Sequence, residues 1–111
     1  MEYGASKAAL INLTRSLGTR LGRHGIRVNA IAPGVINTAM GARVSQAMRD
    51  KLAAACPLGR FGEPEEIASV VDFLVSDDAS FITCATIDGS VRTRADKASS
   101  SSIALLMTRP S

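Results

Sequence analysis

Residues 1–22, MEYGASKAALINLTRSLGTRLG, decide the fold class of this chain. Ala9, Leu13, Leu17 and Leu21 are spaced four apart, and this period predicts a long helix with a continuous apolar stripe. Further small and apolar residues widen the apolar surface, which indicates that the helix is buried on more than one side. Such a helix needs a sheet and a partner helix to cover it, so this stretch favours an α/β protein.

Two residues at the start of this helix can carry chemistry. Tyr3 and Lys7 are four apart, so their side chains can lie within mutual reach on one helix face. A free tyrosine ionises near ~10, and a neighbouring cation lowers that pKa by roughly 1–3 units. Such a phenol can donate a proton to a carbonyl oxygen or remove one from an alcohol. Because the same spacing often arises by chance, a purely structural role for the pair stays open at this point.

The segment after the first helix predicts a buried strand. The helix is expected to run from about Glu2 to Arg23 and to end at His24 and Gly25, because glycine favours the left-handed conformation found at helix ends. The following IRVNAIAPG is short, apolar and closed by proline and glycine, as in a buried parallel strand. We expect the amide of Asn29, in the middle of this strand, to hydrogen-bond a neighbouring loop, because a buried amide without partners is costly.

Two more helices and a second strand follow. One apolar stripe runs from Val44 to Ala55 and stops before Pro57, and another, from residue 67 to 74, follows Pro64 in the first helical turn. FITCATIDG, residues 81–89, then predicts a second buried strand. The order helix–strand–helix–helix–strand predicts an α/β unit with parallel strands.

Composition limits the function of the chain. Its 111 residues fit one domain, with 46% apolar and 21% charged residues. Residues 1–89 hold nine basic and nine acidic side chains, so the net charge of +3 comes from residues 90–111 and argues against a nucleic-acid-binding face. Two cysteines and one histidine cannot complete a four-ligand metal site. No apolar run suits a membrane span or a signal peptide, so we expect a cytoplasmic protein.

The last 22 residues differ in character from the rest. Residues 90–111 contain a serine run, scattered charge and one short apolar patch, IALLM, without a sustained period. This composition predicts a disordered or weakly ordered tail, with a surface helix as the alternative.

Three blocks in order carry a family resemblance. YGASKAAL, then RVNAIAPG with VINT after it, then PLGRFGEPEEIASVVDFLVSDDASFITCATIDG together resemble the C-terminal half of a short-chain dehydrogenase/reductase (SDR). The resemblance covers residues 3–89. It implies that residues 1–89 are the C-terminal part of a Rossmann-like doubly wound parallel sheet, in which the two predicted strands come last.

The resemblance also implies an activity. In the family, the tyrosine at Tyr3 is the general acid/base, and the lysine at Lys7 lowers the pKa of that tyrosine and binds the nicotinamide ribose. The implied reaction is hydride transfer between NAD or NADP and a ketone or alcohol, with 3-oxoacyl thioesters among the candidate substrates. Apart from the resemblance, the first helix is apolar over more of its circumference than two strands can cover, so a homo-oligomer is the expected assembly.

Further positions of this sequence match the cofactor side of the family's site. Pro33 and Gly34 match the turn that passes the nicotinamide. Ile36 matches the position whose backbone meets the carboxamide, and Thr38 matches a cofactor-side hydroxyl. Residues 39–58 match the variable region that closes over the substrate.

The sequence also departs from the family pattern. The glycine-rich phosphate loop and the catalytic serine are expected upstream of Tyr3, and Cys84 stands where the family usually has glycine. Two functions therefore stay open: an oxidoreductase that carries half of its site here, or a non-catalytic module that self-associates or pairs with another chain.

Overall fold

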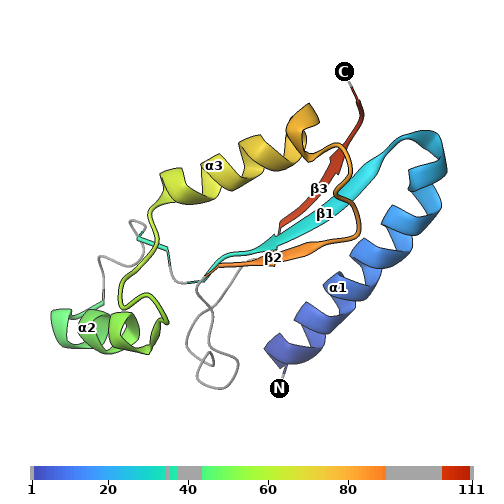
Figure 1. The fold of residues 1–111 in the computed structure, drawn as a ribbon. Coiled ribbons are helices and arrows are strands. Elements are labelled where there is room, and N and C mark those ends of the chain that lie inside the picture. The colour runs from blue at the N-terminus through green and yellow to red at the C-terminus, as the bar shows by residue number, and fades with distance from the viewer. Residues whose placement is uncertain (1, 35, 38–43, 90–103, 111) are drawn as a thin grey trace.

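The structure is a computed structural model that describes residues 2–34, 36–37, 44–89 and 104–110, with the side chains of Glu2 and Tyr3 outside that description. Its elements are α1 (Glu2–Leu21), the 3-10 helix η1 (Gly22–His24), β1 (Arg27–Ala32), α2 (Gln46–Ala55), α3 (Pro64–Val75), the 3-10 helix η3 (Asp77–Ala79), β2 (Thr86–Asp88) and β3 (Ala104–Thr108) (Figure 1). The predicted order of helices and strands over residues 1–89 is confirmed. None of the described helices combines the length and the apolar character that crossing a membrane requires.

The sheet has three described strands in the order β2-β1-β3. β1 and β2 are parallel, with Ala30 opposite Thr86 and Ala32 opposite Asp88, which confirms the predicted parallel pair. β3 runs antiparallel along the other edge of β1. Figure 1 shows the strands between α1 and α3, the arrangement of a partial Rossmann-like α/β fold.

The core is centred on β1. Val28, Ala30 and Ala32 are fully buried, and since side chains alternate along a strand they share one face, opposite to that of Arg27 and Asn29. The Arg27 guanidinium donates to the carbonyls of Leu74 (2.8 Å) and Ser76 (3.1 Å), at the end of α3. The bond to Leu74 thereby pairs a carbonyl in the last turn of α3, where carbonyls have no intrahelical partners.

Asn29 has the role that the sequence predicted. It is 1% exposed. Its Nδ2 donates to the carbonyl of Ile82 (3.0 Å), and its Oδ1 accepts from the amide of Ala85 (3.1 Å). The buried amide therefore ties β1 to the loop that precedes β2.

The buried face of α1 differs from the predicted stripe. Thr14 and Gly18 are buried against the rest of the fold, whereas Leu13 is 46% exposed and Ala9 is exposed. The Thr14 hydroxyl donates to the Leu10 carbonyl one turn earlier, which lets a polar side chain sit on a buried face. The buried face is therefore rotated away from Ala9 and Leu13, while Leu17 and Leu21 of the predicted stripe stay half-buried.

β2 is shorter than the predicted strand 81–89. Cys84 has φ of 64°, a left-handed conformation that an extended strand does not accommodate. Its amide still donates to the Val28 carbonyl (2.7 Å). The chain becomes regular strand only at Thr86–Asp88.

Part of the predicted tail is ordered in the structure. Ala104–Thr108 forms β3, and its residues pair from Thr108 opposite Arg27 to Ala104 opposite Ile31. The expectation of disorder is therefore wrong for these five residues, while residues 90–103 lie outside the description. The apolar residues of this segment show no helical or strand period, and the segment forms a strand because it pairs with the edge of β1.

The starts of α2 and α3 carry local signals. The Ser45 hydroxyl accepts from the amide of Met48 (3.2 Å) and caps α2. Pro64 occupies the first turn of α3, as predicted, and the Glu63 amide donates to Glu66 Oε1 (2.9 Å). Gly25, with φ of 75°, ends the first helical segment in the predicted left-handed conformation.

Candidate functional site

An ion pair marks the end of the sheet. Lys7 Nζ lies 3.1 Å from Asp88 Oδ1, and the two side chains are 20% and 54% exposed. Lys7 projects from α1, and Asp88 is the last residue of β2, opposite Ala32 at the end of β1. A side chain on a helix is thus fixed against the carboxyl ends of two parallel strands, where ligands bind in open α/β sheets.

The predicted turn residues Pro33 and Gly34 lie at the same end. The Gly89 amide donates to the Ala32 carbonyl (3.0 Å). A Cβ on Gly89 would lie 3.6 Å from Pro33 Cα and 3.7 Å from Gly34 N, so the two backbones pass side by side. The fold therefore places Pro33 and Gly34 beside the residue that follows Asp88.

Ile36 is held by a single bridge to Gly62. The hydrogen bond of this bridge comes from the next residue, because the Asn37 amide donates to the Gly62 carbonyl (2.7 Å). Because successive backbone groups of an extended chain point to opposite sides, the N–H and C=O of Ile36 point away from Gly62. A backbone donor and acceptor on one side suit a primary carboxamide, which presents the complementary acceptor and donor.

Two predicted site residues cannot be placed in full. Tyr3 belongs to the first turn of α1, four residues before Lys7, but its side chain lies outside the described residues. Thr38 lies outside them entirely. The structure thus places Lys7 and the Pro33–Gly34 turn at the same end of the sheet, beside Asp88 and Gly89 respectively. The Tyr3–Lys7 contact stays a prediction.

Sequence reasoning missed Asp88. An aspartate after a strand is common at turns, and nothing in the sequence links it to a lysine 81 positions earlier. Only the parallel register of β1 and β2, together with the packing of α1, brings the carboxylate to the ammonium.

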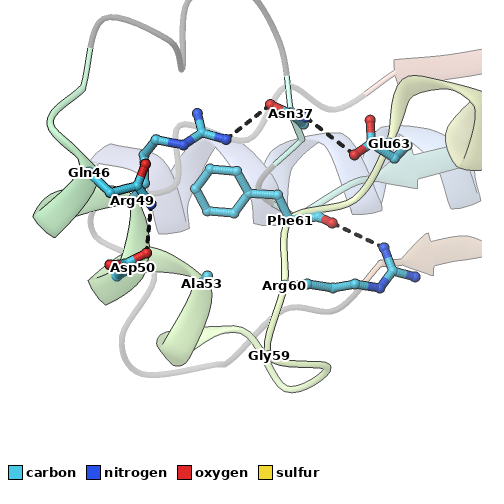
Figure 2. A pocket seen from close by; sticks show the side chains of 9 residues that line it. All are labelled: Asn37, Gln46, Arg49, Asp50, Ala53, Gly59, Arg60, Phe61 and Glu63. Atoms are coloured by element: carbon cyan, nitrogen blue, oxygen red, sulfur yellow. Dashed lines mark hydrogen bonds between the residues drawn. The ribbon is translucent and has the colours of Figure 1, made fainter.

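A second feature is an open pocket of about 310 Å³ between α2 and the loop that leads to α3. Figure 2 shows its lining residues: Asn37, Gln46, Arg49, Asp50, Ala53, Gly59, Arg60, Phe61 and Glu63. The Arg49 guanidinium lies 4.9 Å from the centre of the Phe61 ring and donates to Asn37 Oδ1 (3.2 Å). Asn37 in turn donates to Glu63 Oε1 (3.3 Å), so the pocket adjoins the segment that carries Ile36.

One charged side chain in the wall of this pocket, Arg60, forms an ion pair. Arg60 donates two hydrogen bonds to the Glu66 carboxylate, at 2.8 and 2.9 Å. These bonds, with a further one from the Glu63 amide, lower the pKa of Glu66 to about 2 from 4.5. The same carboxylate raises the pKa of Arg60. The pair braces the loop against the first turn of α3.

Comparison with known proteins assigns the family. A family model described as enoyl-(acyl carrier protein) reductase matches residues 1–89. The chain belongs to the short-chain dehydrogenase/reductase family. It is 46% identical over 87 residues to a (3R)-3-hydroxyacyl-CoA dehydrogenase of Mus musculus, an alignment that covers 78% of this chain and 34% of the relative.

Other SDR relatives are named for different activities. A 3-oxoacyl-[acyl-carrier-protein] reductase of Pseudomonas aeruginosa is 48% identical over 78% of this chain and 35% of its own length. A 3alpha-hydroxysteroid dehydrogenase of Mediterraneibacter gnavus is 49% identical over 81% of this chain and 37% of its own length. The chain spans about a third of the length of these SDR relatives, so its match concerns one part of their fold.

Proposed function

We propose that residues 1–89 form the nicotinamide-side half of an NAD(P)-dependent oxidoreductase that interconverts a ketone and an alcohol. One observation supports this proposal above others: the Lys7 ammonium is paired with Asp88 at the carboxyl end of β2, one helical turn from Tyr3. The next residue, Gly89, lies beside the Pro33–Gly34 turn. Family membership supports an oxidoreductase of SDR type.

The described residues fit the nicotinamide end of a cofactor. Lys7 would donate to the ribose hydroxyls, and the Ile36 backbone would bind the carboxamide, while Pro33 and Gly34 would leave room for the ring. Thr38 is proposed as a further hydroxyl contact. When bound, the nicotinamide supplies or accepts the hydride.

Proton transfer is assigned to Tyr3. In the reductive direction, hydride adds to the carbonyl carbon while the phenol gives its proton to the carbonyl oxygen, which yields the alcohol. Lys7 stabilises the resulting phenolate, which then regains a proton from solvent. In the oxidative direction, the phenolate removes the hydroxyl proton as hydride leaves carbon.

The names of the relatives suggest the substrate class. Several act on 3-hydroxyacyl or 3-oxoacyl thioesters, and the steroid enzyme acts on a secondary alcohol. We therefore propose a 3-oxoacyl thioester, or a similar ketone, as the substrate.

A fusion protein tests the assignment. Residues 2–89, placed behind the N-terminal half of a related reductase, should restore nicotinamide oxidation with a 3-oxoacyl thioester. Tyr3→Phe should then lower kcat by ~10²–10⁴, since the transferable proton is lost. A Tyr3→Phe fusion that folds, by circular dichroism, and keeps the parental kcat would exclude Tyr3 as the acid.

A non-catalytic interaction module is the alternative for the chain by itself. It is favoured by the half-exposed Leu13 on α1 and by the fully exposed Phe81. The isolated chain contains no glycine-rich phosphate loop, so we expect weak or no NADH binding in a fluorescence titration. Saturable binding at low micromolar concentration would instead favour catalysis by this chain alone.

A further inference from the structure

We propose that Asp88 is a positioning residue: it holds the Lys7 ammonium at the end of β2 and offsets the charge that Lys7 exerts on Tyr3. This inference rests on the proposed function, in which Lys7 acts on the Tyr3 phenol. It adds a residue to the pair of Tyr3 and Lys7, whose four-residue spacing is the YxxxK motif.

The first argument is the rigidity of the carboxylate. Asp88 pairs with Ala32 in the parallel ladder, and the next amide, that of Gly89, donates to the Ala32 carbonyl at 3.0 Å. Ala32 is itself fully buried. The backbone that carries the carboxylate is therefore fixed to the core on both sides of its Cα atom.

The second argument is the difference between the two partners. Lys7 has a flexible four-carbon stem on a helix, so its ammonium lies where a partner holds it. The 3.1 Å ion pair is also better shielded from water on the lysine side, which is 20% exposed, than the Arg60–Glu66 pair, whose side chains are 53% and 48% exposed. An ammonium has three N–H donors, so one bond to Asp88 leaves donor capacity for a phenolate and a ribose hydroxyl.

The third argument concerns charge. Within the described part of the chain, Asp88 is the one acidic group within ion-pair distance of Lys7. A carboxylate at 3.1 Å cancels much of the ammonium's field at a more distant atom. Asp88 thus lessens the stabilisation of a Tyr3 phenolate, and it keeps the ammonium at one place.

The experiment uses the full chain, because Tyr3 is its sole tyrosine and tryptophan is absent. Absorbance titration of tyrosinate therefore reports the pKa of Tyr3 alone. Asp88→Asn should lower that pKa by roughly 0.5–1 unit, as removal of a nearby anion favours the phenolate. Asp88→Glu, which keeps the charge, should titrate near the wild type. Asp72→Asn, on the exposed surface of α3, is the matched control and should cause no shift.

A second readout follows Lys7 directly. Freed from its carboxylate, Lys7 should react faster with an amine-modifying reagent, measured by mass spectrometry against the exposed Lys51 as internal standard. Circular dichroism verifies that each variant folds. A Lys7 reaction rate that is unchanged in Asp88→Asn would overturn the positioning role.

Lys7→Met separates this inference from the proposed function. If Lys7→Met raises the pKa of Tyr3 but Asp88→Asn does not change it, the proposed effect of the Asp88 charge on Tyr3 is wrong and the Tyr3–Lys7 pair stands. If Lys7→Met leaves the pKa of Tyr3 unchanged, the proposed function loses its acid/base pair. In that case the proposed effect of Asp88 on the pKa of Tyr3 is also wrong, even if Asp88→Asn changes the reactivity of Lys7.

Discussion

The sulfur of Cys84 lies against Gly18 of α1, so closely that a Cβ on Gly18 would overlap it. The Sγ atom also lies 3.7 Å from the Arg15 carbonyl, one turn earlier on the helix. A left-handed cysteine in the loop and a glycine in the helix are therefore matched in shape, which fixes how α1 crosses the start of β2.

Gly18→Ala should destabilise the chain despite the better helix propensity of alanine. That propensity favours the variant by about 1 kcal/mol, whereas overpacking costs roughly 1–3 kcal/mol. We expect a net loss in the free energy of unfolding, measured by urea titration.

Cys84→Gly is the matched second change. It removes the sulfur and places a glycine at φ of 64°, where glycine has no steric cost. Added to Gly18→Ala, it should recover most of the lost stability. If the double variant were as unstable as Gly18→Ala, the Sγ contact would not be the cause.

Asn29→Leu should destabilise the fold more than a surface substitution does. It leaves the Ile82 carbonyl and the Ala85 amide without the Asn29 side chain, and a buried polar group without a partner costs about 1–3 kcal/mol. Asn12→Leu, at an exposed asparagine of α1, serves as the control. Equal denaturation midpoints for the two variants would contradict the tie between β1 and the loop.

Glu66 should make stability depend on pH in acid. Its pKa is lowered in the folded chain to about 2 from 4.5, so its contribution is fully present above about pH 4.5 and is lost as pH falls towards 2. The difference in Tm between wild type and Glu66→Gln should shrink over this window. Because the pair is exposed, the effect should be small, and Glu65→Gln is the neighbouring control. A constant difference from neutral pH to pH 2 would argue against the Arg60 pairing.

Because β3 covers the edge of β1, it should limit association between copies of this chain. Leu106→Pro, at the middle of β3 and opposite Asn29, should free this edge and raise the apparent mass in light scattering. Arg109→Pro, just beyond the strand, places the same residue outside the ladder. Association that rises equally in both variants would show that the edge is not responsible.

Self-association through α1 is a separate expectation, since a half-exposed Leu13 offers apolar surface to a second copy. Leu13→Glu should yield a folded chain of lower apparent mass, while Leu17→Glu, at a half-buried position, should also lose helical circular dichroism. A wild-type chain that is monomeric at high concentration would remove the support for this interface.

Local chemistry made several features predictable from the sequence. The 3.6-residue period predicted the helices, Pro64 and Gly25 marked a helix start and a helix end, and a short β-branched run predicted β1. The sequence also predicted that Asn29 would hydrogen-bond a neighbouring loop, because a buried side-chain amide requires hydrogen-bond partners. The YxxxK spacing predicted a candidate proton-transfer pair for the same reason, since four residues complete about one helical turn.

The features that sequence reasoning missed depend on contacts between distant segments. β3 has no period of its own and is a strand because the edge of β1 offers backbone partners. β2 begins only after the left-handed Cys84, whose sulfur lies against Gly18 of α1. On α1 itself, Thr14 is buried and Leu13 is exposed. Asp88 meets Lys7 only through strand register. The sequence alone determined the three α-helices and β1, because propensity acts within a few residues. Tertiary structure alone decided which faces are buried and which charges meet, because these follow from packing between segments up to 81 positions apart.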